Sequence, residues 1–290
     1  MEIRRTFLHS KLARRIFWLF VLCALFPITI LAIVSLRNVT AQLKEQSRIH
    51  LHQESRDEAL AIFERLRFLE ADMELVTSSV RGLSDRTTRA YSLGSTNLSS
   101  NFARGFKGLD IVSHGDHKTL FGESAPQIDF TKEQQATLQS GKTILSTIEC
   151  NHQEPCIIMS RELTEGHPEQ GLLVAELKGS YLWDVENLVQ DMGLCVLDPS
   201  GKPLFCSAES PSTFPERATH SFSGEFEWGI SGHEYLASYW NLPLQATFSA
   251  THWTIIGSMA KPDIVAPLAC LIHEGGDFVR VESWSGEIGR

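Results

Sequence analysis

The sequence predicts an α+β protein: an N-terminal transmembrane helix, a long helix after it, and two tandem modules built on antiparallel sheets. Three observations predict this arrangement: an uncharged stretch near the start, a following stretch with almost no helix breakers, and two later regions in which short strand patterns recur. With 290 residues, of which 42% are hydrophobic and 21% are charged, the chain is long enough for one large core or two small ones.

The uncharged stretch covers residues 16–36 and contains 21 residues. At about 1.5 Å of rise per residue, a helix of this length crosses the roughly 30 Å hydrocarbon layer of a bilayer. A cleaved signal peptide is the alternative. Its apolar region is typically about 7–15 residues long and precedes a small-x-small cleavage site, which does not follow here. We therefore expect an uncleaved membrane anchor.

Charge predicts the orientation of this anchor. Five basic residues precede it, and basic residues are retained on the cytoplasmic side. They are Arg4, Arg5, Lys11, Arg14 and Arg15. The part after residue 36 is therefore expected outside the cytoplasm. Without those five residues and Glu2, the chain holds 34 acidic and 21 basic residues, so nucleic acid is not expected as a partner.

Four of the six cysteines stand in two close pairs, Cys150 with Cys156 and Cys195 with Cys206. An oxidising compartment could bridge both pairs. The second pair lies symmetrically about the turn-forming residues 199–202, so a hairpin would place its two members opposite each other. The alternative is that all four are reduced cysteines that pack as small apolar residues.

Residues 38–91 contain no proline and a single glycine, which predicts a long helix. Apolar residues in its second half recur at alternating spacings of four and three: Ile62, Leu66, Leu69, Met73, Val76, Val80 and Leu83. This spacing is typical of a coiled-coil seam, through which the chain would form a homodimer, or of an amphipathic helix packed on its own domain. The first half, which includes His50, His52 and Arg56, is expected to be solvated.

Two later regions repeat one pattern. Residues 108–112 and 193–197 each lead through a polar turn into a second strand pattern that ends in Leu-Phe. Residues 172–177 and 254–259 are each followed by the start of a helix, and both separations are about 82 to 85 residues. A tandem duplication of one small module explains these echoes.

Motifs of enzymes do not occur: there is no Gly-rich phosphate loop, Gly-x-Ser-x-Gly elbow, His-Glu-x-x-His helix or pair of Cys-x-x-Cys knuckles. We therefore expect no catalytic centre. A hydrolase whose nucleophile and base come from distant positions stays as an alternative. The tightest group of metal-ligand residue types is His114, Asp116 and His117 in a polar turn, which would need further ligands, so neither a metal ion nor another cofactor is expected.

The order of membrane span, long helix and two modules resembles the double Cache sensor domains of bacterial chemoreceptors, sensor histidine kinases and diguanylate cyclases, over residues 38–268. Residues 141–146, 156–163 and 171–177 look like the closing sheet segments of the family's membrane-distal module. Residues 198–201 look like the first hairpin of the membrane-proximal module. These four segments carry the resemblance.

The resemblance implies two PAS-like modules, at residues 93–187 and 188–268, after a cytoplasmic tail (1–15), the span (16–36) and the long helix (37–92). It also implies a membrane-anchored, extracytoplasmic small-ligand sensor for transmembrane signalling. This chain is expected to cross the bacterial inner membrane once, with its modules in the periplasm or outside the cell. The alternative function is a periplasmic scaffold whose modules bind protein and hold no small-molecule pocket.

The resemblance further implies a ligand site in the membrane-distal module, and we take Glu176, Arg161, Glu149 and Ser146 as its candidate residues. Family members that bind amino acids carry an arginine and a Trp-Tyr pair, then a tyrosine, then an aspartate for the ligand's ammonium group. Here residues 129–133 replace the first group, Glu149 replaces the tyrosine, and Glu176 retains an acid. Amino acids of the usual kind are therefore not expected, and the sequence does not name the small-molecule ligand; if Glu176 faces a partly buried pocket, it can hold a cationic or amine ligand. Alternatively, Glu176 faces solvent from an edge strand.

Family members return to the membrane through a second span. Residues 269–290 are too polar to cross a bilayer, because they contain six charged residues. We therefore expect an exported polar tail, either of a shortened receptor or of a stand-alone sensor that acts through a partner in the membrane.

Overall fold

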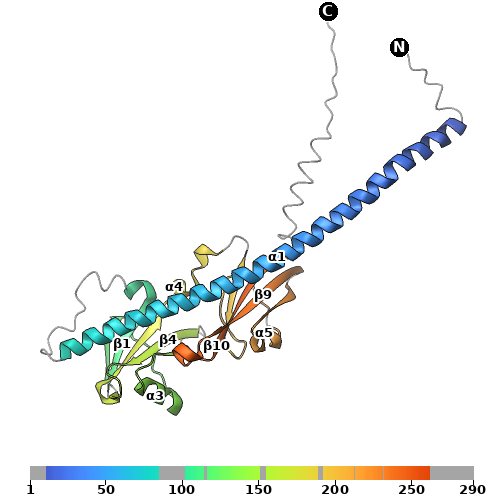
Figure 1. Ribbon diagram of the computed structural model, residues 1–290. Helices are drawn as coiled ribbons and strands as arrows, with labels where there is room; N and C mark the ends of the chain where they lie inside the picture. The colour runs from blue at the N-terminus through green and yellow to red at the C-terminus, as the bar shows by residue number, and fades with distance from the viewer. Residues whose placement is uncertain are drawn as a thin grey trace, which may run out of the picture. The chain divides into compact units, whose positions relative to one another are not determined.

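The computed structural model describes residues 11–84, 102–113, 116–150, 155–188, 192–211, 213–230 and 232–261. The chain divides into two compact units, residues 1–49 with 262–290, and residues 50–261. The described part of the first unit is the beginning of α1 (Lys11–Ser84), a helix of 74 residues (Figure 1). The predicted polar tail and His114 lie outside the described residues.

Residues 17–36 of α1 expose their large apolar side chains: Phe17, Trp18, Leu19, Phe20, Leu22, Leu25, Phe26, Ile28, Ile30, Leu31, Ile33, Val34 and Leu36. Among the described helices, α1 has the length and the apolar composition to cross a membrane. A signal sequence close to the N-terminus would meet the same criterion.

The first module contains one antiparallel sheet of five strands in the order β2-β1-β5-β4-β3. Its strands are β1 (Phe106–Ser113), β2 (Asp116–Gly122), β3 (Ile144–Glu149), β4 (Pro155–Glu162) and β5 (Leu172–Leu177). Two short helices, α3 (Lys132–Gln139) and the 3-10 helix η2 (Pro168–Gln170), lie between strands. A capping box formed by Thr131 and Gln134 starts α3, because each side chain satisfies a backbone N–H of the other residue.

The second module has the same topology, with the strand order β7-β6-β10-β9-β8. Its strands are β6 (Gly193–Leu197), β7 (Pro203–Cys206), β8 (Ser223–Ile230), β9 (His233–Pro243) and β10 (His252–Ala260). The short helices are α4 (Gly179–Trp183) and η3 (Val185–Asn187) between the modules, and α5 (Glu216–His220) and α6 (Gln245–Phe248) within the second. The predicted α+β fold with two antiparallel modules is therefore confirmed.

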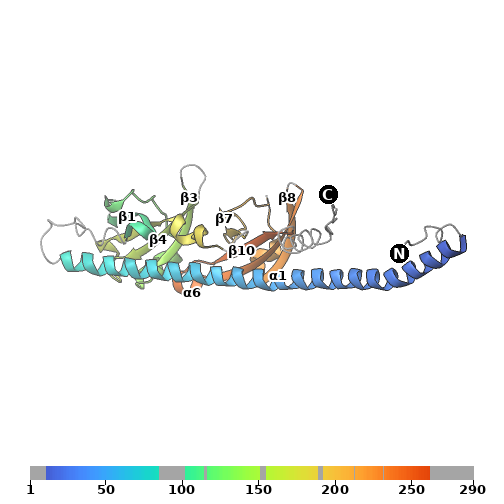
Figure 2. The same cartoon turned by 90° about the horizontal axis from the view of Figure 1, so that it is seen from above.

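One face of α1 packs on both sheets, as Figure 2 also shows. Its residues Ile62, Leu66, Leu69, Met73 and Val76 are each at most 3% exposed. They belong to one core cluster with residues of both modules, such as Leu109, Leu173, Val196 and Ile255. The interpretation of these residues as a dimer seam is therefore wrong. The same spacing of four and three residues also lines one face of an ordinary amphipathic helix.

This packing begins earlier than the sequence predicted. Leu51 and Ser55 are buried, and the Ser55 hydroxyl donates to the backbone carbonyl of Ser238 at 3.1 Å. His52 Nδ1 lies 2.9 Å from the Ser238 hydroxyl. The expectation of a solvated first half therefore holds for the side on which His50 and Arg56 are exposed, but not for the side that carries Leu51 and Ser55. Two of the buried positions carry the small residues Ser55 and Ala59, so this part of the helix shows no pattern of large apolar residues in the sequence.

Candidate functional site

A cavity of about 860 Å³ lies where the two modules meet. Its walls come from β1, β4 and β5 of the first module and from α4 and the residues that follow it. Leu204 and Phe205 on β7 of the second module complete the wall. Charged residues in the lining are Lys107, Glu176, Lys178, Asp184 and Glu186. The volume falls in the range of about 300–1,000 Å³ that is typical of small-molecule sites.

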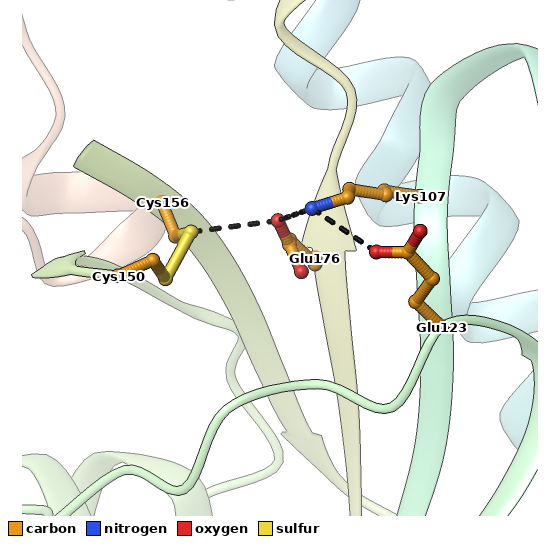
Figure 3. Close-up of a disulfide and its surroundings, with 5 residues drawn as sticks. All are labelled: Lys107, Glu123, Cys150, Cys156 and Glu176. Carbon is orange, nitrogen blue, oxygen red and sulfur yellow. Dashed lines mark hydrogen bonds and ion pairs between the residues drawn. A yellow bond between two sulfur atoms is a disulfide. The ribbon is translucent and has the colours of Figure 1, made fainter. Parts of the chain in front are cut away.

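Lys107, Glu123 and Glu176 form a charged triad at this cavity, and Glu176 is its most deeply buried side chain. Its side chain is 9% exposed, whereas that of Lys107 is 47% exposed. The Lys107 ammonium donates to Glu176 Oε1 at 3.0 Å and lies 3.2 Å from Glu123 Oε2 (Figure 3). The hydrogen bonds from Lys107 to Glu176 and then to Glu123 raise the pKa of Lys107. The ionised triad therefore has one more negative charge than positive charges.

A β-bulge in β1 directs Lys107 toward this acid. Phe106 and Gly108 pair with consecutive residues of β5, so Lys107 is the extra residue between them. A Cβ added at Gly108 would lie 1.8 Å from the Glu123 carbonyl oxygen. Because Gly108 has no side chain, the Glu123 backbone can approach closely, and its N–H donates to the Lys107 carbonyl at 3.3 Å.

A disulfide between Cys150 and Cys156 forms the adjacent wall, with an S–S distance of 2.10 Å and a Cα–Cα distance of 5.8 Å. Cys156 Sγ lies 3.4 Å from Glu176 Oε1. A bridged sulfur carries no hydrogen, so this is a non-bonded contact and not a hydrogen bond. The second disulfide joins Cys195 on β6 to Cys206 on β7, which are direct partners in the ladder.

Two aromatic side chains, those of Trp183 and Phe205, belong to the apolar part of the cavity wall. Trp183 at the end of α4 stacks on Phe205 of β7, with ring centroids 5.5 Å apart and planes at 16°. Trp183 also contacts Trp253, at 5.8 Å between centroids. The stack joins the two modules at the cavity wall and offers an apolar surface to a bound molecule.

Asp184, next along the wall, connects the cavity to α1. The Arg65 guanidinium on α1 donates to Asp184 Oδ2 at 3.2 Å, to the Leu182 carbonyl at 2.8 Å and to Glu58 Oε1 at 2.9 Å. Asn187 donates to both Asp184 carboxylate oxygens. These bonds hold Asp184 in the left-handed region (φ 39°), which residues other than glycine rarely adopt. Burial raises the pKa of Glu58, although Arg65 opposes the shift.

Two of the four predicted ligand-binding residues lie on the same face of the first sheet. Glu176 lines the cavity and is 6% exposed, so the solvent-facing alternative is wrong. Ser146 is separated from it by one strand, because Ile158 pairs with Glu176 on one side and with Ser146 on the other. Ser146 is not part of the described cavity wall.

The other two predicted residues make structural contacts and are not part of the described cavity wall. Arg161 donates to the Thr143 hydroxyl at 3.2 Å and lies 3.4 Å from Glu74 on α1. Successive strand residues point to opposite faces, and Arg161 is on the face toward α1. Glu149 pairs with Lys202 in the turn between β6 and β7, and this bond lowers the pKa of Glu149. Neither residue meets Glu176.

The face of the first sheet that points away from α1 also carries Glu176. In the described part of the chain, apolar side chains fill much of this face. Ala125, Ile158 and Val174 form a buried cluster there, with partly buried residues packed against them: Val112, Ile128, Ile148, Cys156 and Leu172. The sequence predicted a ligand site within this module. The cavity is lined mainly by residues of this module, including Glu176, and Leu204 and Phe205 of the second module complete its wall.

Sequence reasoning missed Lys107, Glu123, Asp184 and the Trp183–Phe205 stack as site residues. Lys107 and Glu123 lie 16 positions apart in the chain and belong to no spacing motif. The one signal for them is Gly108 inside a strand pattern, since glycine in a strand often marks a bulge or a close backbone approach.

Comparison with known proteins identifies the fold. No protein-family model matches the chain, and no similar curated protein was found. The ligand-binding domain of the Pseudomonas fluorescens chemoreceptor CtaA, in complex with L-isoleucine, is similar with a TM-score of 0.56 and 13% identity, over 78% of this chain and 97% of that one. The corresponding domain of Pseudomonas aeruginosa PctB, in complex with L-Arg, has a TM-score of 0.54 and 15% identity, over 76% and 97%.

The extracellular domain of vpHK1S-Z8, which is named as a histidine kinase, is similar with a TM-score of 0.52 and 13% identity, over 77% of this chain and 97% of that one. These identities are low, so the similarity concerns the fold. The chain has the fold of the ligand-binding sensor domains of chemoreceptors and histidine kinases, the double Cache fold that the order of its elements predicts.

Proposed function

We propose that this protein is a membrane-anchored sensor whose modules lie outside the cytoplasm and bind a small cationic amine in the cavity between them. The triad of Glu123, Lys107 and Glu176 carries this proposal, because it places an excess carboxylate at a cavity of about 860 Å³. CtaA and PctB are seen with L-isoleucine and L-Arg, which both carry an ammonium group.

Charge favours an amine over an acid as the ligand. A ligand carboxylate would add a third negative group to a triad that already has two carboxylates and one ammonium. A ligand ammonium would neutralise the triad. Its hydrogen bond to the buried Glu176 would be charge-assisted and partly shielded from water. The apolar remainder of the ligand would pack on Trp183 and Phe205.

The contacts of Asp184 supply a route from the cavity to the membrane. A ligand that shifts the segment after α4 would move Asp184 and the Leu182 carbonyl, and Arg65 bonds both of them to α1. The helix is continuous from Lys11 to Ser84 and includes the apolar residues 16–36. Signalling then requires two arrangements of this segment with different affinities for the ligand.

Three observations support export with a cytoplasmic N-terminus. Residues 17–36 expose a long apolar surface that a bilayer would cover. Five basic residues precede it, which is typical of the cytoplasmic side. Both pairs of exported cysteines are bridged, which an oxidising compartment favours.

We further propose that two copies associate through the outer face of α1 and not through the buried face. Leu60, Phe68 and Leu75 are 43%, 65% and 59% exposed and stand seven or eight residues apart, so they share one face. Copies that are anchored with the same orientation would meet in parallel along this face, and the contact would cover apolar surface.

Thermal unfolding of the full chain in detergent tests the ligand class, because a ligand that binds only the folded state raises the midpoint. The panel contains matched compounds: phenethylamine, phenylalanine and hydrocinnamate, with purines and metal ions beside them. We expect phenethylamine to raise the midpoint by several degrees at saturating concentration and Glu176→Gln to abolish the shift. A shift with hydrocinnamate would contradict an amine ligand. No shift with any compound would favour the protein-interaction alternative.

A further inference from the structure

We propose that Lys107 is a built-in competitor of the ligand: its ammonium occupies Glu176 when the cavity is empty and moves onto Glu123 when an amine binds. This inference rests on the proposed amine ligand and specifies how its affinity is set. A lysine side chain ends in a primary ammonium on an alkyl stem, which is the same chemistry as the expected ligand.

The positions of the two acids allow this exchange without movement of the backbone. The Lys107 ammonium is 3.0 Å from Glu176 Oε1 and 3.2 Å from Glu123 Oε2, so it contacts both acceptors at once. A small rotation of its stem can give up the first contact and keep the second. The Glu123 side chain is 73% exposed, so solvent assists this second position.

The difference in burial between the two acids explains why an empty site needs the lysine. Glu176, with a side chain 9% exposed, would be costly to leave charged and unpaired, whereas the exposed Glu123 is stable in water without a partner. Lys107 therefore balances Glu176 in the empty site and leaves only a weak, solvated contact when a ligand replaces it.

The backbone keeps this arrangement in place. Lys107 is fixed by the bulge in β1, and the Glu123 N–H bonds to the Lys107 carbonyl at 3.3 Å. The close approach at Gly108 leaves no room for a side chain. The two residues of the exchange are thus held together independently of their ion pair, and only side-chain torsions change.

The competition by Lys107 sets a minimum affinity that a ligand must have for the cavity. A ligand must displace a tethered ammonium, so small cations without an apolar body bind too weakly, while the contact with the Trp183–Phe205 stack gives an apolar amine the advantage. In the opposite mechanism, Lys107 would receive the carboxylate of an amino acid. Removal of Lys107 would then weaken binding, whereas removal of a competitor strengthens it.

Calorimetric titration of the full chain in detergent with phenethylamine and phenylalanine distinguishes the two mechanisms. We expect Lys107→Gln to bind phenethylamine about five- to tenfold more tightly, the factor that one partly screened ion pair supplies. Glu123→Gln is expected to weaken binding about threefold, because Lys107 then has no second carboxylate to pair with. In the Lys107→Gln background, Glu123→Gln is expected to have little effect, and this non-additivity is the mark of an exchange.

Two matched controls separate exchange from the general charge of the cavity. Lys178→Gln removes a lysine that also lines the cavity, but whose ammonium donates to the Ala103 carbonyl at 3.2 Å. Glu186→Gln removes an exposed acid of the same lining. Each is expected to change the phenethylamine affinity by less than about twofold. Lys107→Met serves as a second variant, and unfolding midpoints check that every variant is folded.

The outcomes separate this inference from the proposed function. If Lys107→Gln weakens binding while Glu176→Gln abolishes it, the amine site stands and the competitor is overturned. Equal effects of Lys107→Gln and Lys178→Gln also overturn the competitor. Binding of phenethylamine by Lys107→Gln but not by the unmodified chain supports it. Absence of binding by both proteins overturns both proposals.

Discussion

The Arg65 guanidinium on α1 lies 3.2 Å from the Asp184 carboxylate in the cavity wall. Arg65 also donates to the Leu182 carbonyl and to Glu58 on its own helix, and its side chain is only 18% exposed. The acceptors around Arg65 are partly buried, so water can replace its hydrogen bonds to them only in part. This hub joins the long helix to the segment that borders the cavity.

Replacement of Arg65 by methionine is expected to destabilise the protein by about 1–3 kcal/mol, because two partly buried carboxylates, those of Glu58 and Asp184, lose their charged partner. Urea unfolding of the full chain in detergent measures this loss. The matched control is Arg67→Met, which removes an arginine whose side chain is 55% exposed and pairs with Glu70 on the same helix, and it should cost less than about 0.5 kcal/mol. Equal losses would contradict the role of Arg65 as a hub.

Leu69 and Phe68 test the two faces of α1, because they are neighbours with exposures of 1% and 65%. Leu69→Ala should lower the free energy of unfolding by about 2–5 kcal/mol, as is usual for a buried leucine. Phe68→Glu with Leu75→Glu should leave the monomer folded and reduce self-association, measured by sedimentation in detergent. A dimer that survives this double substitution would exclude the outer face as the interface.

Glu162 should make stability depend on pH. Its carboxylate is buried and Oε2 has no hydrogen-bond partner among the described residues, and burial raises its pKa above 4.5 in spite of a bond from the Gly166 backbone. The folded state therefore holds the proton more tightly than the unfolded state. The resulting stabilisation is complete below pH 4.5 and is lost as the pH rises through the raised pKa.

Glu162→Gln should remove this loss. The difference between its unfolding midpoint and that of the unmodified chain should become more positive as the pH increases from about 4 to 8, since glutamine stays neutral throughout. Glu133→Gln, on an exposed position of α3, is the control and should follow the unmodified chain at each pH. A constant difference between Glu162→Gln and the unmodified chain would contradict a buried, titrating carboxyl.

The two disulfides should differ in their effect on the ligand. Serine replacement of either pair removes a short loop closure and is expected to cost about 2–3 kcal/mol. Only the pair Cys150 and Cys156 touches Glu176, so its removal should also change phenethylamine affinity. Replacement of Cys195 and Cys206 should leave that affinity within about twofold. Equal changes in affinity would mean that the first disulfide acts through overall stability.

Several features of the protein were predictable from the sequence because they depend on neighbours in the chain. An uncharged stretch at residues 16–36, the absence of helix breakers, and strand patterns that recur after 82 to 85 residues predicted the long helix and the two similar modules. Residues 199–202 likewise predicted the hairpin that sets Cys195 opposite Cys206. Glu176 was predicted as a site residue, and it does line the cavity.

The partners of these elements were decided by the tertiary structure. A spacing of four and three states that Leu69 and Val76 share a face, but not whether a second copy or the chain's own sheets cover it. Lys107 and Glu123 meet because a bulge and Gly108 bring two backbones together. Helix and strand periodicity is local, whereas a cavity needs side chains from distant segments to converge, and no spacing within one segment encodes that convergence.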